Sequence, residues 1–84
     1  MADLPYHPID CGFHDELLAL ATLRRECEVV FLDEQGQEST RRSRIEDVYS
    51  RAGAEYLRLA DGTTVRLDRL VRVDGRPLPP STGP

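Results

Sequence analysis

Two histidines and two cysteines in the first third of the chain have the types and spacing that could bind a metal ion. His7, Cys11 and His14 follow the pattern H-x3-C-x2-H, and Cys27 comes later. Imidazole and thiolate are zinc ligands, but structural zinc sites in short chains normally have paired ligands at both ends. The second half of this pattern is a lone cysteine. We therefore expect no metal, and expect Cys11 and Cys27 to be unbridged thiols that fill small spaces in the core. A zinc-stabilised adaptor is the open alternative.

Cys11 and His14 could instead act as a nucleophile and its base. They stand three positions apart at a predicted helix start, where a thiolate is favoured. No glycine-rich phosphate loop or hydrolase motif accompanies them, and a chain of 84 residues has room for only a shallow pocket. The sequence therefore predicts a protein that is not an enzyme and that uses no cofactor.

Acidic residues gather where the same helix is predicted to begin. Asp10, Asp15 and Glu16 surround His14, and their carboxylates give that end of the helix a negative field. Helix capping alone would account for Asp10. The group is nevertheless the first candidate for a surface that binds a partner.

One basic run is the competing candidate. Arg41, Arg42 and Arg44, with Tyr49 nearby, could offer cations and an aromatic platform to nucleic acid. The whole chain, however, has 15 acidic against 11 basic residues and a net charge of −4. Affinity for nucleic acid comes largely from cations that neutralise phosphates. We therefore interpret the run as a solvated strand face, and expect a basic protein surface as the partner.

The elements that must position these residues are one short helix and several strands. Apolar residues at helical spacing predict a helix over residues 13–25, with Asp10 as its N-cap and with Asp15 and Glu16 in or near its first turn. Two arginines, Arg24 and Arg25, would close it.

Everything after the helix has the texture of β-structure. In chain order we first expect a strand over Glu26–Leu32, a turn at 33–36, and a polar edge or strongly bent strand at 37–44. A bulge within 45–49 and a turn at 50–53 should follow. The last elements are a strand at 54–60, a type I′ turn at 61–62, and a strand at 63–73 that is broken at Asp68. At that break we expect Asp68 to bond backbone. The expected core residues of the later strands are Tyr56, Leu57, Leu59, Val65 and Leu67.

This layout predicts a mainly β (α+β) fold in which one N-terminal helix packs on a small five- or six-stranded bent antiparallel barrel. We expect one domain over residues 6–74, a flexible N-terminus at 1–5 and a disordered proline-rich tail at 75–84. No apolar run approaches the ~18 residues of a membrane span, and the start lacks the features of a secretory signal. The expected location is therefore the cytoplasm.

Four motifs follow one another along the chain. They are Tyr6-His7-Pro8-Ile9-Asp10-Cys11, a helix with Asp15 and Leu17, Glu55-Tyr56-Leu57, and Arg66-Leu67-Asp68-Arg69-Leu70. Taken together, they resemble the Rof family of bacterial Rho-binding antiterminators, whose pattern is Y-x-P-I-x-C, a helix, E-Y-L and R-L-D-x-I. The opening motif is the specific part. Gly12 and Phe13 stand where the family often has an acidic pair, and His14 stands where it usually has a tyrosine.

The resemblance implies an Sm-like fold and a function. Such a protein would bind the N-terminal, RNA-binding domain of the transcription terminator Rho, mask its primary RNA site and lower Rho-dependent termination. By position, the partner-binding residues would be Asp10, His14, Asp15, Glu16, Ser50 and Arg51. We expect a monomer that touches neither nucleic acid nor membrane. The alternative is an Sm-like module that binds RNA as an oligomer through the basic run and Tyr49.

Overall fold

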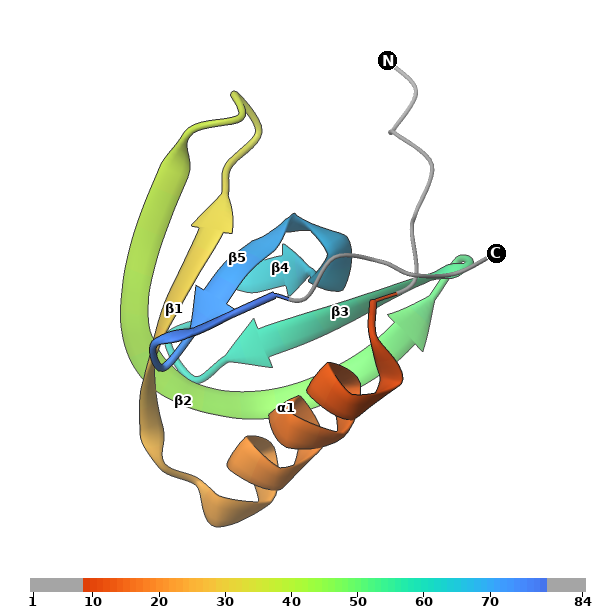
Figure 1. The fold of residues 1–84 in the computed structure, drawn as a ribbon, viewed down its shortest axis with the longest axis vertical. Helices are drawn as coiled ribbons and strands as arrows, with labels where there is room; N and C mark the ends of the chain where they lie inside the picture. Colours follow the sequence, from red (N-terminus) through yellow and green to blue (C-terminus); the bar gives the residue numbers. More distant parts are fainter. Residues whose placement is uncertain (1–8, 79–84) are drawn as a thin grey trace.

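The computed structural model describes residues 9–78, which form one helix and a six-stranded antiparallel sheet (Figure 1). The elements are α1 (Cys11–Leu23), β1 (Glu26–Leu32), β2 (Glu38–Arg51), β3 (Ala54–Leu59), β4 (Thr64–Arg66), the 3-10 helix η1 (Leu67–Arg69), β5 (Leu70–Val73) and β6 (Arg76–Pro77). The predicted mainly β, barrel-like fold with one N-terminal helix is confirmed. The predicted flexible segment 1–5 lies outside the described residues.

The long strand β2 joins the two halves of the sheet. The strand order is β4-β3-β2-β1-β5-β6. The first half of β2 pairs with β1, and its second half pairs with β3. The change of partner coincides with a register shift between Ile45 and Asp47, which is the predicted bulge, and β2 curves strongly in Figure 1. A bulge bends its strand, so one continuous strand serves both halves.

The polar first half of β2 is both an edge and part of a bent strand, as predicted. Within the described part of the chain it pairs with β1 on one side only, since β3 joins β2 from Ile45 onward. Ser43 and Ile45 are the side chains of the segment 38–45 that are buried. The polar composition therefore follows from how little of this segment reaches the core.

Tight turns connect the strands. Gly36 has a φ of 80° in the turn after β1. In the β2–β3 turn both Ala52 and Gly53 have positive φ, 53° and 82°, which is the pattern of a type I′ hairpin turn. The geometry of such a turn matches the twist of the flanking strands, so two residues are enough to connect β2 with β3.

The predicted type I′ turn at residues 61–62 is wrong. Only Gly62 of that pair has a positive φ, 96°. The loop is longer, because the Leu59 N–H donates to the Thr63 carbonyl at 2.8 Å and the Gly62 N–H donates to the Leu59 carbonyl at 2.9 Å. Asp61 Oδ1 accepts from the Thr63 N–H at 2.8 Å, and this hydrogen bond lowers the pKa of the Asp61 carboxyl. The side-chain hydrogen bond stabilises a turn that the Asp-Gly pair alone did not specify.

The chain breaks at Asp68, as predicted, where η1 turns it from β4 into β5. The Asp68 carboxylate accepts from the Arg66 guanidinium at 2.6 and 3.0 Å. The predicted tail at 75–84 begins too early, because β6 pairs with β5 and the Leu78 N–H donates to the Val71 carbonyl at 2.9 Å. The remainder of that tail, 79–84, lies outside the described residues.

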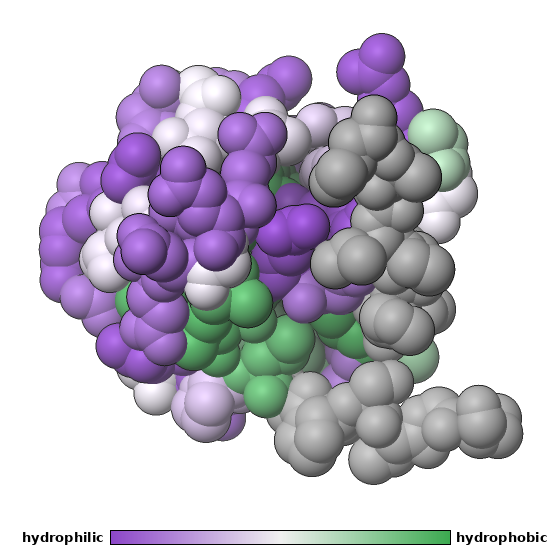
Figure 2. Space-filling view, turned by 90° about the horizontal axis from the view of Figure 1, so that it is seen from above, coloured by the Kyte–Doolittle hydropathy of each residue, from purple (hydrophilic) through white to green (hydrophobic). Residues whose placement is uncertain are grey.

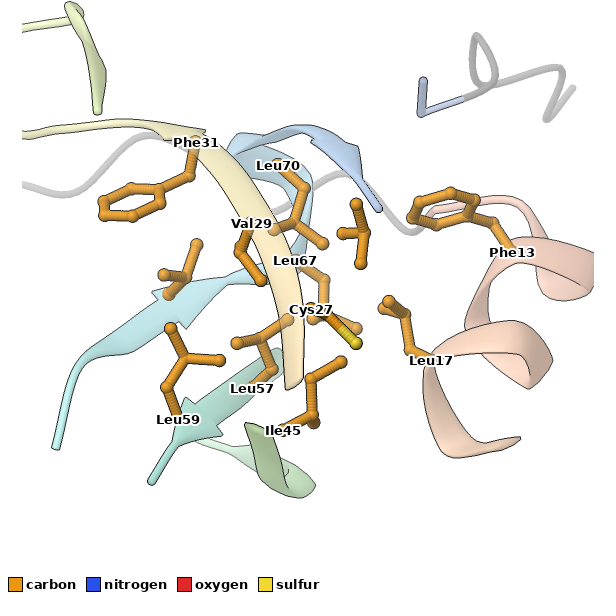
Figure 3. Packing of buried hydrophobic residues seen from close by; sticks show 12 residues of the cluster. Phe13, Leu17, Cys27, Val29, Phe31, Ile45, Leu57, Leu59, Leu67 and Leu70 are labelled. Carbon is orange, nitrogen blue, oxygen red and sulfur yellow. The ribbon is translucent and has the colours of Figure 1, made fainter. Parts of the chain in front are cut away.

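A single apolar core lies between the sheet and α1. Phe13 and Leu17 point from the helix toward the strands, and they belong to the same cluster as the buried strand residues (Figure 3). Four of the five predicted core residues are buried, namely Leu57, Leu59, Val65 and Leu67. Tyr56 is only partly buried, because it faces away from Leu57 along the same strand.

Asp10 is the N-cap of α1, as predicted. Its Oδ2 accepts from the Phe13 N–H at 3.1 Å. The helix starts at Cys11, earlier than predicted, so Asp15 and Glu16 lie beyond its first turn. It also ends earlier, at Leu23, with Arg24 as a C-cap in the left-handed region at a φ of 54°. The interaction of charged side chains with the helix dipole is correspondingly weaker than expected.

The cap gives a first prediction. Asp10→Ala should lower the free energy of unfolding by about 1 kcal/mol, because it leaves a helix N–H without its acceptor. Asp10→Asn should cost far less, since an asparagine oxygen caps equally well without a charge. Urea unfolding followed by circular dichroism measures both. Equal losses for the two variants would mean that the charge, and not the hydrogen bond, stabilises the helix start.

Candidate functional site

The structure brings the start of α1 and the β2–β3 hairpin together. The His14 Nε2 atom lies 3.2 Å from the Glu55 Oε2 atom. Glu55 is opposite Ser50 in the β2–β3 ladder, so their side chains share one face of the hairpin. Figure 1 shows the start of the helix beside the end of this hairpin. The helix start at 10–16 and the β2–β3 hairpin at Ser50 and Glu55 are distant in the sequence, and they thus contribute to one surface.

The candidate residues on this surface differ in how available their charges are. Asp15 is exposed on the outside of the helix. Asp10 is exposed too, but one of its oxygens caps the helix. Glu16 is half-buried and pairs with Arg76, which belongs to β6. Asp15 therefore offers the carboxylate with the fewest commitments within its own chain.

Arg51 and Ser50 occupy different faces of the hairpin. Side chains alternate along a strand, so Arg51 points away from the face that Ser50 shares with Glu55. Both residues are exposed. Of the two predicted hairpin contacts, Ser50 lies on the same face as Glu55, whereas Arg51 lies on the other face at the hairpin end.

The surface is negative as a whole. We define the acidic surface as the carboxylates of the helix start and of the neighbouring strand, together with His14 and Ser50. The carboxylates are those of Asp10, Asp15, Glu16 and Glu55. Arg76 contacts this group through the Glu16 carboxylate. A positively charged partner would meet a net negative field here, which weakens with salt because the charges are near water.

Sequence reasoning missed one residue of this surface, Glu55, and one cation that contacts it, Arg76. Glu55 was assigned to the strand framework, although its ladder position opposite Ser50 places it beside the helix. Arg76 was placed in a disordered tail, and it lies 60 positions from Glu16. A hairpin register could have indicated Glu55. No local signal pointed to Arg76, because its contact depends on how β6 folds back.

The cysteines are in contrasting environments. Cys11 is exposed at the helix start, so its predicted place in the core is wrong. Cys27 is buried, and its Sγ donates to the Arg25 carbonyl at 3.2 Å. Burial raises the pKa of the Cys27 thiol, and the nearby carboxylate of Asp74 raises it further. Both are free thiols, as predicted.

The zinc alternative gains no support within residues 9–78. Its ligand His7 lies outside them, and the described part of the chain contains no group of three or more potential metal ligands. His14 is directed instead to the Glu55 carboxylate. The other three candidates are thus not gathered into a metal-binding group.

The two thiols should react at different rates. With iodoacetamide under native conditions, Cys11 should be alkylated rapidly, because only an accessible thiolate attacks. Cys27 should react only as the protein unfolds, since it is buried and its pKa is raised. Mass spectrometry should therefore show one fast adduct, mapped to Cys11. Two equally fast adducts would contradict the packing of Cys27.

The basic run on β2 is accompanied by acids. Arg42 stands opposite Glu28 and Arg44 opposite Glu26 in the ladder with β1. The guanidinium of Arg41 donates to the Thr40 carbonyl at 3.0 Å. Opposite charges on neighbouring strands reduce the positive field, so the run has less attraction for phosphates than three arginines alone would have.

The aromatic platform of the alternative is displaced from that run. Tyr49 stacks on Tyr56, with ring centroids 5.6 Å apart and planes 21° apart. Tyr49 comes five positions after Arg44, or about 16 Å along an extended strand. The pair could receive a base, but the cations of the basic run do not surround it.

A groove of about 410 Å³ lies between the β1–β2 loop and β4 with η1. Its walls include Phe31, Tyr56 and Val65, with Arg66 and Arg69 among the polar residues. Arg66 is paired with Asp68, and Arg69 donates to the Asp33 carbonyl at 3.2 Å. These contacts engage the cations of the groove within the fold, so the groove does not resemble an anion-binding site.

In the view of Figure 2, hydrophilic residues cover most of the described surface, with an apolar strip between them.

No family model matches the chain, and no curated protein is significantly similar to it. Over residues 9–78, no helix has the length and apolar character needed to cross a membrane.

Proposed function

We propose that this protein is a non-enzymatic inhibitor of Rho-dependent transcription termination that binds the N-terminal, RNA-binding domain of Rho through the acidic surface. The observation that carries the proposal is the contact between His14 and Glu55, which joins the helix start to the hairpin. The resemblance to the Rof family assigns the helix start, 10–16, and residues 50–51 of this hairpin to the partner.

The mechanism would be competition for a basic groove. A groove that binds RNA carries cations for the phosphates, and carboxylates held on a rigid surface can occupy the same positions. Asp10 and Asp15 sit on a helix whose Phe13 and Leu17 are buried in the core. Because the helix is anchored, little conformational entropy is lost when its carboxylates meet the partner.

The position of Phe13 alters how charge reaches the partner. Family members often have acids at the positions of Gly12 and Phe13, but Phe13 is 4% exposed and belongs to the core. A Cβ added at Gly12 would lie 3.1 Å from the Asp10 Oδ2 that caps the helix. The negative charge must therefore come from the other carboxylates of the acidic surface. Because Glu55 is one of them, the hairpin is part of that surface.

Charge reversal tests the mechanism. Asp15→Lys should weaken binding to the isolated Rho N-terminal domain by about tenfold or more, since a favourable contact becomes a repulsive one. The double variant Asp15→Lys with Glu16→Lys should abolish binding and restore termination in a transcription assay. Calorimetry at two salt concentrations should show that wild-type binding weakens as salt rises.

Glu34→Lys is the matched control. It makes the same change in net charge as Asp15→Lys, but within the β1–β2 loop, which lies away from α1 in Figure 1. It should bind Rho like the wild type. Full inhibition by the double variant, or an equal loss with Glu34→Lys, would contradict a mechanism based on the acidic surface.

The Tyr49–Tyr56 stack favours one competing function, an Sm-like RNA-binding oligomer. A gel shift with single-stranded RNA, combined with a mass measurement in solution, separates the two proposals. Inhibition of Rho predicts no shift at micromolar protein. A shift that Tyr49→Ala removes, given by a ring of several copies, would favour RNA binding instead.

A further inference from the structure

Among the strands of residues 9–78, none covers the outer edge of the first half of β2. Residues 38–44 pair with β1, and β3 begins to pair with β2 only at Ile45. Within residues 9–78, the sheet order places no further strand beside this half. A strand edge of this kind presents backbone donors and acceptors to any extended chain that can align with it.

The hydrogen bonds at both ends of the segment show which residues face this edge. The Gln37 carbonyl accepts from the Asp33 N–H, so it points toward β1. The Arg44 carbonyl accepts from the Ala60 N–H, so it points the other way, toward the β3–β4 loop. Because direction alternates along a strand, the backbone groups of Glu38, Thr40 and Arg42 point outward.

This edge is complementary to a copy of itself. If two such edges run antiparallel about a two-fold axis at Thr40, each Thr40 faces its counterpart. Glu38 then faces Arg42 of the second copy, and Arg42 faces its Glu38. All three positions are outward-facing, so each can exchange backbone hydrogen bonds, and opposite charges stand directly across from each other.

We propose that two copies of this chain associate by antiparallel pairing of residues 38–42, which continues the sheet from one molecule into the next. A two-fold interface of this kind is closed, so it yields a dimer and not a fibre. The alignment centred on Thr40 uses every outward-facing residue. An alignment centred on Arg42 would oppose two arginines and repel, so the charges also select the register.

The dimer would be weak, because a five-residue edge buries far less than the ~1,200 Å² of a stable interface. At high protein concentration, this dimer would form in place of the monomer that the sequence predicts. The edge is separate from the acidic surface, which lies at the opposite half of β2 and on α1. Loss of Rho binding would therefore leave this proposal intact, and the reverse also holds.

Complementary charge variants test the pairing. Sedimentation velocity from micromolar to millimolar protein should show a reversible dimer of the wild type, with amide shifts of Thr40 and Arg42 changing in step. Glu38→Arg alone and Arg42→Glu alone should each raise the dimer dissociation constant by about tenfold, since each places like charges opposite at two positions.

An equimolar mixture of these two variants should dimerise like the wild type, because every contact between them again joins an acid to a base. Arg42 also faces Glu28 in its own sheet, so the fold of each variant is checked by circular dichroism. Recovery in the mixture shows that each single variant is folded and able to pair. A mixture no better than its components would overturn the proposal.

Thr40→Pro tests the backbone contacts without altering charge. The Thr40 N–H points away from β1, so proline at this edge should leave the β1–β2 ladder intact while removing a donor from the dimer. Thr40→Ala keeps the donor and should dimerise as the wild type does. A wild type that is monomeric at one millimolar, or a Thr40→Pro variant that dimerises normally, would overturn the proposal.

Discussion

The bend of β2 is the constraint on which the other features of this structure depend. One strand of 14 residues pairs first with β1 and then with β3, and the register shift near Ile45 separates the two ladders. A bulge increases local twist, so the strand can curve around a core that a flat sheet could not enclose. Ile45 is 1% exposed at that point, which ties the bend to the core.

The two ends of β2 therefore have different surroundings. Its second half carries the hairpin whose Glu55 meets His14, and so it completes the acidic surface. Its first half extends past β3 and keeps a backbone edge open. The same geometry thus separates a charged surface suited to a basic partner from an edge suited to strand pairing.

Charges in this small protein are largely arranged by contacts between distant segments. Glu16 meets Arg76, and Arg25 meets Asp74 at 2.5 Å across 49 positions. These pairs connect the helix and its C-terminal end to the β5–β6 region. Exposed pairs of this kind contribute little to stability individually, so their main effect is on where uncompensated charge remains. The uncompensated charge that remains at the helix start is negative, and the Asp15 carboxylate is the most available part of it.

Patterns within short segments were sufficient to predict much of the fold. Strand Glu26–Leu32, the cap at Asp10, the bulge after Arg44 and the break at Asp68 were all predicted, because apolar spacing, capping and turn residues act over a few positions. The loop at Asp61 was misjudged, since its length depends on hydrogen bonds from Leu59 to Thr63.

The sequence by itself determined the fold class, the helix and most strand positions, because periodicity records which side chains must be buried. Only the tertiary structure decided that Cys27 is buried while Cys11 is exposed, that Glu55 lies beside His14, and that Arg76 compensates Glu16. Each of these depends on strand register or on the path of β6, which bring together residues that no local pattern connects.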